Sequence, residues 1–271
     1  MADIHADLPE LFDLDCGDFA DDLSFYESLA RRSEGPVLEL GVGTGRVAIP
    51  LARAGWEVWG IDLSEAMLAR ARYKTGQALV LPREGRLHLL PGDMRDFELG
   101  RRFDLIFAGL GTFHHLLTPD DQRSCLRCVR RHLAPGGLFV CDLRPLLFSA
   151  WERGASVPLL HDWTRVLPST GETVAKLRSV RADPARQVQH ETHIYDRLLA
   201  DGTVRRVVAT VDLRFTTRYE MEGLLREAGL ELDQVYGDFD LSPYDDASEY
   251  LITVARRSPS GRRRRSPKES T

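Results

Sequence analysis

Two carboxylates and a set of closely spaced glycines form a pattern that suits nucleoside binding. Glu39 stands two residues before the first of three glycines at alternate positions. Two apolar segments follow the glycines, and Asp62 ends the second of them. The glycines are Gly41, Gly43 and Gly45. Glycines permit a tight turn with close ligand approach, and an acidic residue at the end of the second strand of a βαβ unit can reach ribose hydroxyls. An ordinary tight turn is the alternative interpretation.

The elements that must position these residues follow from the spacing of apolar side chains. Residues 36–40 suit a buried strand, residues 47–54 repeat apolar side chains at helical spacing, and residues 56–62 suit a second strand. The order strand, glycine-rich turn, helix and strand defines a βαβ unit. The sequence therefore predicts an α/β core that binds its ligand at this turn.

The glycine spacing restricts which nucleoside fits. A dinucleotide-binding turn needs another glycine at position 46, beside the pyrophosphate, and this chain has Arg46. The pattern ExGxGxG from Glu39 to Gly45 instead resembles the first motif of class I S-adenosylmethionine-dependent methyltransferases. The resemblance implies that the loop holds the methionine part of S-adenosyl-L-methionine and Asp62 its ribose, with S-adenosyl-L-homocysteine as product. It also implies cofactor contacts from Val42, Arg46, Leu63, Met67 and Leu110.

A second segment resembles the part of these enzymes that binds adenine. Residues 92–97 (GDMRDF) follow a predicted strand at 86–91. The resemblance implies that Asp93 accepts a hydrogen bond from the exocyclic amine and that Met94 frames the ring. A helix cap or a solvated loop is the alternative for such an acidic turn. Residues 132–140 (HLAPGGLFV) also resemble the family, at its turn into the fifth strand.

The resemblance implies an α/β fold with a Rossmann-like seven-stranded sheet and helices on both faces. Residues 157–215 depart from this pattern: they alternate in β fashion, with turns near 182–185 and 200–202. We therefore expect an inserted antiparallel β subdomain that roofs the substrate pocket. The predicted division is 1–34 as lid segment and helix, 35–150 as cofactor-binding core, 151–215 as insertion, 216–256 as completion of the core, and 257–271 as a disordered basic tail.

The first 19 residues are acidic and irregular, and a helix is predicted at about 21–32. In methyltransferases of similar layout such a leader lies over the cofactor and substrate. Phe12, Phe19 and Tyr26 are therefore candidate lid residues, with Tyr26 a candidate contact to the substrate. Plain packing against the sheet is the alternative.

The expected chemistry is an in-line displacement of the methyl group onto a nitrogen or oxygen of a small-molecule acceptor. Alignment of the acceptor can supply up to roughly 7–11 kcal/mol, and a hydroxyl acceptor would also benefit from a general base. His114 and His115, in the loop after the predicted fourth strand, are the candidate bases or acceptor ligands. Asp142, at the end of the fifth strand, and Tyr195, in the insertion, are further candidate substrate contacts.

Two other histidines lie in the insertion. His193 shares a strand face with Tyr195, whereas His190 faces the other way. These residues could line the roof of the pocket, but a solvated sheet face is the favoured interpretation.

Composition excludes several classes of protein. With 43% hydrophobic and 28% charged residues the chain suits a globular fold, and neither an 18-residue apolar run nor a signal peptide is evident, so a cytoplasmic location is expected. The net charge of −5 divides into +6 for residues 256–271 and −11 for the remainder, which argues against a nucleic-acid surface outside the tail. The four cysteines, Cys16, Cys125, Cys128 and Cys141, have no convincing metal-ligand spacing.

Two other functions are compatible with the same fold. One is aminopropyl transfer from a decarboxylated cofactor, which Glu39 disfavours because it suits a cofactor with its amino acid end intact. The other is a non-catalytic nucleoside-binding protein that uses its basic tail to contact RNA or a partner protein. The expected assembly is a monomer or homodimer.

Overall fold

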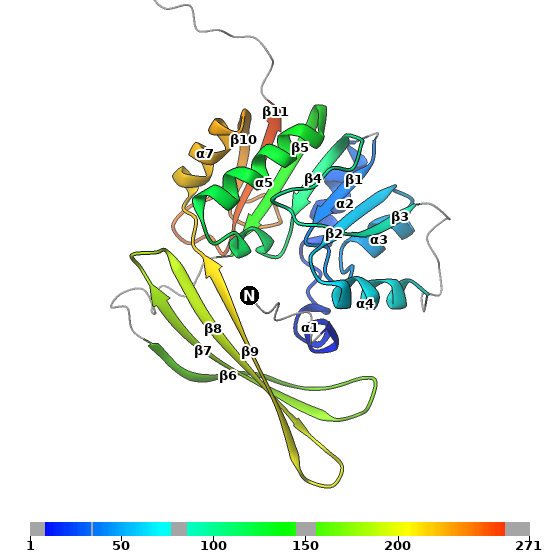
Figure 1. Cartoon of the computed structure of the whole chain (residues 1–271), viewed down its shortest axis with the longest axis vertical. Coiled ribbons are helices and arrows are strands. Elements are labelled where there is room, and N and C mark those ends of the chain that lie inside the picture. The colour runs from blue at the N-terminus through cyan, green and yellow to red at the C-terminus, as the bar shows by residue number, and fades with distance from the viewer. Residues whose placement is uncertain (1–8, 34, 77–85, 145–155, 258–271) are drawn as a thin grey trace, which may run out of the picture.

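The computed structural model describes residues 9–33, 35–76, 86–144 and 156–257. These residues form a seven-stranded sheet with helices on both faces and a separate four-stranded antiparallel sheet on the side where the parallel strands of the large sheet end (Figure 1). The predicted fold class is confirmed. Apart from Arg257, the predicted basic tail lies outside the described residues, as do residues 151–155 of the predicted insertion.

The seven-stranded sheet has the strand order β10-β11-β5-β4-β1-β2-β3. Its strands are β1 (Val37–Leu40), β2 (Val58–Asp62), β3 (Leu87–Pro91), β4 (Phe103–Ala108), β5 (Leu133–Leu143), β10 (Leu230–Tyr236) and β11 (Leu251–Arg257). The first five are parallel, whereas β11 runs antiparallel to β5 and to β10. The last two strands of the chain thus form a reversed hairpin at this edge of the sheet. The strand order switches direction between β1 and β4, and open α/β sheets bind ligands at the carboxyl ends of the strands beside such a switch.

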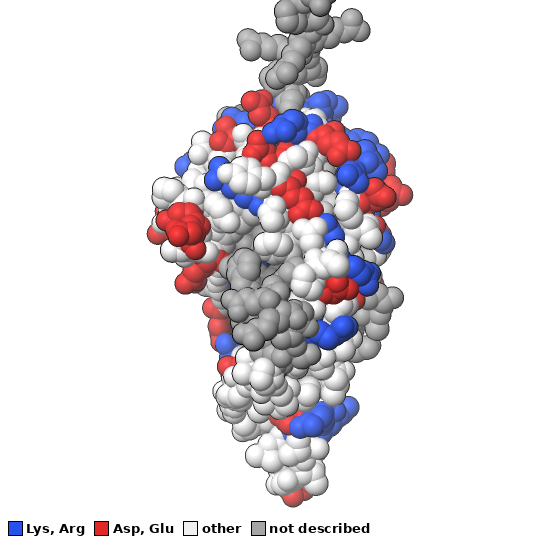
Figure 2. Space-filling view, turned by 90° about the vertical axis from the view of Figure 1, so that its left-hand side faces the viewer, with Lys and Arg blue, Asp and Glu red and all other residues white. Residues whose placement is uncertain are grey.

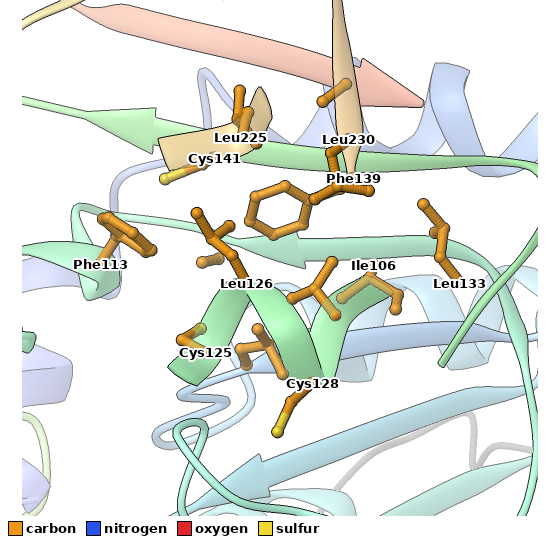
Figure 3. Packing of buried hydrophobic residues seen from close by; sticks show 14 of the residues in the cluster. Ile106, Phe113, Cys125, Leu126, Cys128, Leu133, Phe139, Cys141, Leu225 and Leu230 are labelled. Atoms are coloured by element: carbon orange, nitrogen blue, oxygen red, sulfur yellow. The ribbon is translucent and has the colours of Figure 1, made fainter. Parts of the chain in front are cut away.

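Helices cover both faces of this sheet. On one face lie α2 (Leu23–Arg31), α3 (Ala48–Ala54) and α4 (Glu65–Gly76); on the other lie α5 (Pro119–His132) and α7 (Arg218–Glu227). Figure 3 shows how Leu126 of α5 packs among Ile106 of β4, Phe139 of β5 and Leu225 of α7. The free cysteines Cys125, Cys128 and Cys141 belong to the same apolar cluster. Because all three cysteines are buried among apolar side chains, they are core residues.

The helices begin where the local sequence offers caps. Thr118 accepts a hydrogen bond from the N–H of Asp121, and Pro119 follows it at the first helical position, so α5 starts there. Thr217 and Glu220 form a reciprocal capping box at the start of α7. These local signals determine where α5 and α7 begin.

A short helix, α1 (Pro9–Cys16), occupies part of the leader that was expected to be irregular. Eight residues are too few for a stable isolated helix. Asp13 ties α1 to the core, because its carboxylate accepts hydrogen bonds from Arg70 (2.8 Å), Lys74 (2.8 Å) and Thr44 (2.6 Å). The expectation of an irregular segment was wrong because these partners lie far away in the sequence.

The insertion forms the predicted meander of β6 (Ser156–Val166), β7 (Thr173–Asp183), β8 (Val188–Leu198) and β9 (Val204–Arg214), paired in that order. It extends from the carboxyl-end side of the large sheet, and α1 lies between the two sheets (Figure 1). Seen from the side, the molecule has a broad upper body and a narrow lower end (Figure 2). The small sheet is therefore placed where it can cover the carboxyl ends of the core strands, at which a ligand is expected to bind.

Candidate functional site

The turns after β1 and β4 meet at the switch point of the sheet. Gly41, Gly43 and Gly45 have φ angles of +67°, +54° and +78°, which residues with side chains rarely adopt. A Cβ atom at Gly41 would lie 2.4 Å from the side chain of Thr112, in the 3-10 helix η1 (Thr112–His115) that follows β4. Only glycine lets the two turns approach this closely.

Asp62, at the end of β2, fixes the glycine turn. The N–H of Gly43 donates to its Oδ2 at 2.7 Å, and the N–H of Ser64 donates to its Oδ1 at 2.9 Å. An ionised carboxylate offers about four lone-pair sites, more than these two backbone donors use. The geometry is therefore compatible with hydroxyl groups as additional donors.

The surroundings of Glu39 indicate whether the expected cofactor suits this site. Its side chain is buried under the glycine turn, and burial raises the pKa of Glu39 well above its usual range even though Arg46 nearby opposes that shift. Within the described part of the chain its Oε2 has no hydrogen-bond partner. An orphaned buried carboxylate oxygen suits a cationic group such as the amino end of S-adenosylmethionine.

Four other residues expected at the cofactor occupy different environments. Val42 and Met67 are buried, and the Met67 methyl group lies 3.4 Å from where a Cβ of Gly43 would be. Leu110 has a φ of +53° and faces the cavity described below. Leu63 is 66% exposed, so its side chain belongs to the surface.

The predicted adenine segment forms the turn after β3. Arg95 donates to both carboxylate oxygens of Asp93, through its side chain (2.6 Å to Oδ2) and its backbone N–H (2.8 Å to Oδ1). These hydrogen bonds lower the pKa of Asp93 and keep it ionised, a state that can accept from an amine. Met94 packs against the apolar cluster of β4 and α5.

Arg46 has a structural partner that the sequence did not reveal. Its guanidinium donates to both oxygens of Asp22 (2.7 and 2.6 Å) and to the carbonyl oxygen of Phe19 (2.8 Å). The Arg46 side chain is only 9% exposed. Its side chain thus ties the glycine turn to the start of α2, whereas a contact to the cofactor was expected.

A cavity of about 660 Å³ lies between the switch-point turns, α1 and the small sheet. Its walls combine three parts of the chain. The core provides Leu110, Gly111, His114, His115 and Arg144; the leader provides Phe12, Asp15, Cys16, Asp18 and Phe19; the small sheet provides Arg165, Lys176, Arg178, Gln189, Glu191, His193, Tyr195, Val211 and Leu213. The cavity is therefore polar toward the small sheet.

Asp15 of α1 closes one side of this cavity. Its carboxylate accepts hydrogen bonds from Lys176 (2.5 Å), Trp163 (2.9 Å) and Tyr195 (3.4 Å), all on the small sheet. Burial alone would raise the pKa of Asp15, but the charge and hydrogen bond of Lys176 outweigh burial and lower it. An ionised Asp15 therefore holds the leader against the insertion.

The inner face of β8 is part of the cavity wall. His193 and Tyr195 share this face, as predicted, and both are buried. His190 faces the other way and bonds to Asp212 at 2.7 Å. The favoured interpretation, a solvated face at His193 and Tyr195, was wrong because α1 and the core cover it.

The two candidate histidines of η1 differ sharply. His114 is 3% exposed, and its Nδ1 and Nε2 lie 2.8 and 3.0 Å from the carbonyl oxygens of Arg214 and Arg144. Burial lowers its pKa. With both nitrogens beside protein carbonyls, His114 has no position from which to accept a substrate proton, so its expected role as base does not fit this geometry. His115 is exposed and lines the cavity, so its role stays a prediction.

Tyr26 and Asp142 lie behind the site and not in it. Both are 0% exposed, and the Tyr26 hydroxyl donates to Asp142 Oδ2 at 2.5 Å while the N–H of Gly111 donates to Oδ1 at 2.9 Å. The Tyr26 ring stacks on Phe107 of β4 at 4.2 Å. This burial contradicts the expectation that either side chain contacts an acceptor. Their bonds instead support the turn that carries Leu110 and Gly111.

We expect a Tyr26→Phe variant to lose about 1–3 kcal/mol of unfolding free energy, because the buried Asp142 carboxylate loses its side-chain donor. Urea unfolding followed by circular dichroism measures this loss. Tyr73→Phe is the matched control, since Tyr73 is exposed and should change stability little. A Tyr26→Phe variant as stable as the control would contradict the assignment.

Much of the cavity wall is formed by residues that were not predicted from the sequence, namely Asp15, Lys176, Arg178 and Glu191. Side chains alternate between the two faces of a strand, and this pattern could have grouped these residues. Positions 189, 191, 193 and 195 share one strand face, and so do 176 and 178. A strand face with this many charged residues is usually solvated. Only the cover supplied by α1 makes it a site.

The described residues contain no group of three or more histidine, cysteine, aspartate or glutamate side chains placed to hold a metal ion. Among the helices formed by those residues, none is long and apolar enough to cross a membrane.

Comparison with known proteins agrees with this geometry. Residues 37–137 match a family described as a methyltransferase domain. The dTDP-3-amino-3,4,6-trideoxy-alpha-D-glucopyranose N,N-dimethyltransferase of Streptomyces venezuelae is 31% identical over 70% of this chain and 81% of its own length. The CcbJ methyltransferase of Streptomyces caelestis is 32% identical, with a TM-score of 0.72 over 88% of this chain and 90% of that one.

A third similar protein has been solved with the cofactor. CalS10, an amino pentose methyltransferase of Micromonospora echinaspora, was solved with S-adenosylmethionine bound, is 26% identical and has a TM-score of 0.65 over 89% of this chain and 91% of that one. The chain belongs to the class I S-adenosylmethionine-dependent methyltransferases. It is an enzyme that transfers the methyl group of this cofactor.

Proposed function

We propose that this enzyme methylates an amine nitrogen of a small polar acceptor, in particular an amino sugar. The observation that supports this most directly is the cavity, which joins the switch-point turns to the polar inner face of the small sheet. Two of the similar proteins, from Streptomyces venezuelae and Micromonospora echinaspora, are named for amino-sugar substrates. A polar wall suits an acceptor that carries several hydrogen-bonding groups.

We also propose which residues hold each part of the cofactor and which hold the acceptor. The glycine turn and Glu39 hold the amino acid end of the cofactor, Asp62 holds the ribose, and the turn of Asp93 and Met94 holds adenine. Leu110, Phe12 and Phe19 separate the cofactor from solvent, because they line the same cavity. The small sheet and His115 hold the acceptor.

When bound, S-adenosylmethionine supplies a methyl group already activated by a sulfonium. The protein must then align the acceptor nitrogen and exclude water, which can contribute about 7–11 kcal/mol. Asp15 contributes to alignment by fixing α1 to the small sheet through Lys176 and Trp163. The rigid turn at Leu110 and Gly111, supported by Asp142, forms the floor.

The test combines binding with turnover. Calorimetry with S-adenosylhomocysteine establishes cofactor binding, and mass spectrometry then follows methyl transfer to dTDP-3-amino-3,4,6-trideoxy-α-D-glucopyranose and to the matched 3-hydroxy sugar nucleotide. We expect methylation of the amine and none of the hydroxyl. Methylation of the hydroxyl alone would identify an oxygen methyltransferase, and binding without turnover on a wider amine panel would contradict the proposal.

For partners, we propose a monomer or homodimer without a nucleic-acid substrate. On the face in Figure 2, lysine and arginine are interspersed with aspartate and glutamate over the upper body. A nucleic-acid surface would instead concentrate positive charge. Light scattering and a filter-binding assay with RNA test both statements.

A further inference from the structure

The strand β8 carries a histidine whose two ring nitrogens have different surroundings. His193 lines the cavity and is 9% exposed. Its Nε2 lies 3.0 Å from Oε2 of Glu191, two residues earlier on the same strand face. Its Nδ1 is buried and has no hydrogen-bond partner among the residues that the structure describes. A buried polar atom without a partner is rare in proteins and is a reason to look for a ligand.

The neighbour of His193 determines which ring nitrogen carries the proton. A carboxylate only accepts hydrogen bonds, so Nε2 must donate to Glu191. In a neutral imidazole the proton then resides on Nε2, and Nδ1 keeps a lone pair. This is the arrangement by which a carboxylate orients a histidine that serves as general base.

Glu191 is itself held in the ionised, oriented state. Burial would raise its pKa, but the hydrogen bonds from His193 and Gln189 and the charge of Arg178 lower it. Gln189 donates to Oε1 at 2.5 Å, which leaves Oε2 for His193. Arg178, opposite His193 on β7, lies 3.9 Å from Oε2. The carboxylate therefore cannot rotate away without losing these contacts.

An amine acceptor creates a need for such a base. An aliphatic amine is an ammonium ion near neutral pH and has no lone pair to attack with. We propose, on the basis of the proposed amine methylation, that Nδ1 of His193 accepts a proton from the acceptor's ammonium group. The N–H bond breaks, its electron pair stays on the acceptor nitrogen, and the proton forms a bond to Nδ1, which leaves the nitrogen ready to take the methyl group.

The other histidines of the cavity fit this task less well. Both nitrogens of His114 face protein carbonyls. His115 is exposed, whereas His193 is buried. Of the three, His193 alone combines burial, a carboxylate partner and a place on the wall that faces the switch-point turns. His190 is a matched control, since it lies on the same strand, pairs with Asp212 and faces the other side.

One test needs no acceptor. In protein labelled with ¹⁵N-histidine, two-bond ¹⁵N–¹H spectra distinguish a protonated from an unprotonated ring nitrogen, and a His193→Gln variant assigns the signals. We expect Nδ1 of His193 to be unprotonated in the neutral ring, and a Glu191→Gln variant to shift the population toward the Nδ1–H tautomer. A wild-type protein with the proton on Nδ1 would overturn the proposal.

The second test is kinetic and uses dTDP-3-amino-3,4,6-trideoxy-α-D-glucopyranose as acceptor. At pH 7 the His193→Gln variant should lose about 10²–10⁴-fold in kcat/KM, as expected for a general base, while its affinity for S-adenosylhomocysteine stays within twofold. The deficit should shrink as the pH rises toward the pKa of the acceptor amine, because the solvent then supplies the neutral amine. His190→Gln should match wild type at every pH.

Three charged groups that face His193 also influence how kcat/KM depends on pH. They are Glu191 beside it, Arg178 on β7 and Asp15 on α1. A deficit that stays constant with pH would indicate a structural role and overturn the proposal, as would full activity of the variant at pH 7. If wild type fails on every amine, the proposed function fails, while the spectroscopic result still decides the state of His193.

Discussion

An Asp22→Ala variant is expected to lose about 3–5 kcal/mol of unfolding free energy. Asp22 is fully buried and accepts two hydrogen bonds from the Arg46 guanidinium, at 2.7 and 2.6 Å. Removal of the carboxylate would leave a buried guanidinium whose one remaining hydrogen-bond partner among the described residues is the carbonyl of Phe19. Urea unfolding monitored by circular dichroism measures the change, and the glycine turn should lose order because Arg46 belongs to it.

Asp21→Ala is the matched control, because Asp21 is the adjacent residue and is exposed. We expect its effect to be within about 0.5 kcal/mol. A double variant, Asp22→Leu with Arg46→Met, should recover most of the loss, since replacing both partners removes the orphaned charge. A single Asp22→Ala variant that loses less than about 1 kcal/mol would mean that the pair contributes little to the fold.

The second large effect concerns the cofactor. We expect Asp62→Ala to weaken binding of S-adenosylhomocysteine by about 10- to 150-fold, which corresponds to about 1.5–3 kcal/mol for charged hydrogen bonds. Calorimetry measures the dissociation constant directly. Asp120→Ala is the control for the substitution itself, because the Asp120 side chain is 93% exposed on α5.

Asp62 also bonds to the N–H groups of Gly43 and Ser64, so loss of affinity could come from a loosened turn. A cofactor analogue without the ribose 2′-hydroxyl separates the two causes. If Asp62 holds this hydroxyl, the variant and wild type should differ much less for the deoxy analogue than for the parent compound. An equal loss for both compounds would contradict the ribose assignment and leave Asp62 as a support of the turn.

The core could be predicted because its signals are local. The glycine turn, Asp62 and the caps at Thr118 and Thr217 act within a few residues of the elements that they define. The helix α1 could not be predicted in this way. Its eight residues are ordered by Arg70, Lys74 and the small sheet, and no local pattern contains those contacts.

The roles of single side chains show the same division. Tyr26, Asp142 and His114 have the residue types of a catalytic site, and their distance from the glycine turn along the chain gives no information about which way they point. In the fold each finds a buried partner: Tyr26 bonds to Asp142, and His114 bonds to two backbone carbonyls. Residue type could nominate these residues, but burial removed them from the site.

From the amino acids alone, periodicity and glycine spacing predicted an α/β core with its ligand at the glycine turn, and the resemblance of the motifs to class I methyltransferases predicted the cofactor, because these signals are properties of neighbouring residues. Which polar residues face the acceptor was decided by the tertiary structure. The inner face of β8 would be solvated on an isolated sheet. It becomes the wall of a cavity because the hydrogen bonds of Asp15 to the small sheet hold α1 over it. That closure depends on contacts between residues about 150 positions apart, and pairing over such distances is governed by packing in three dimensions.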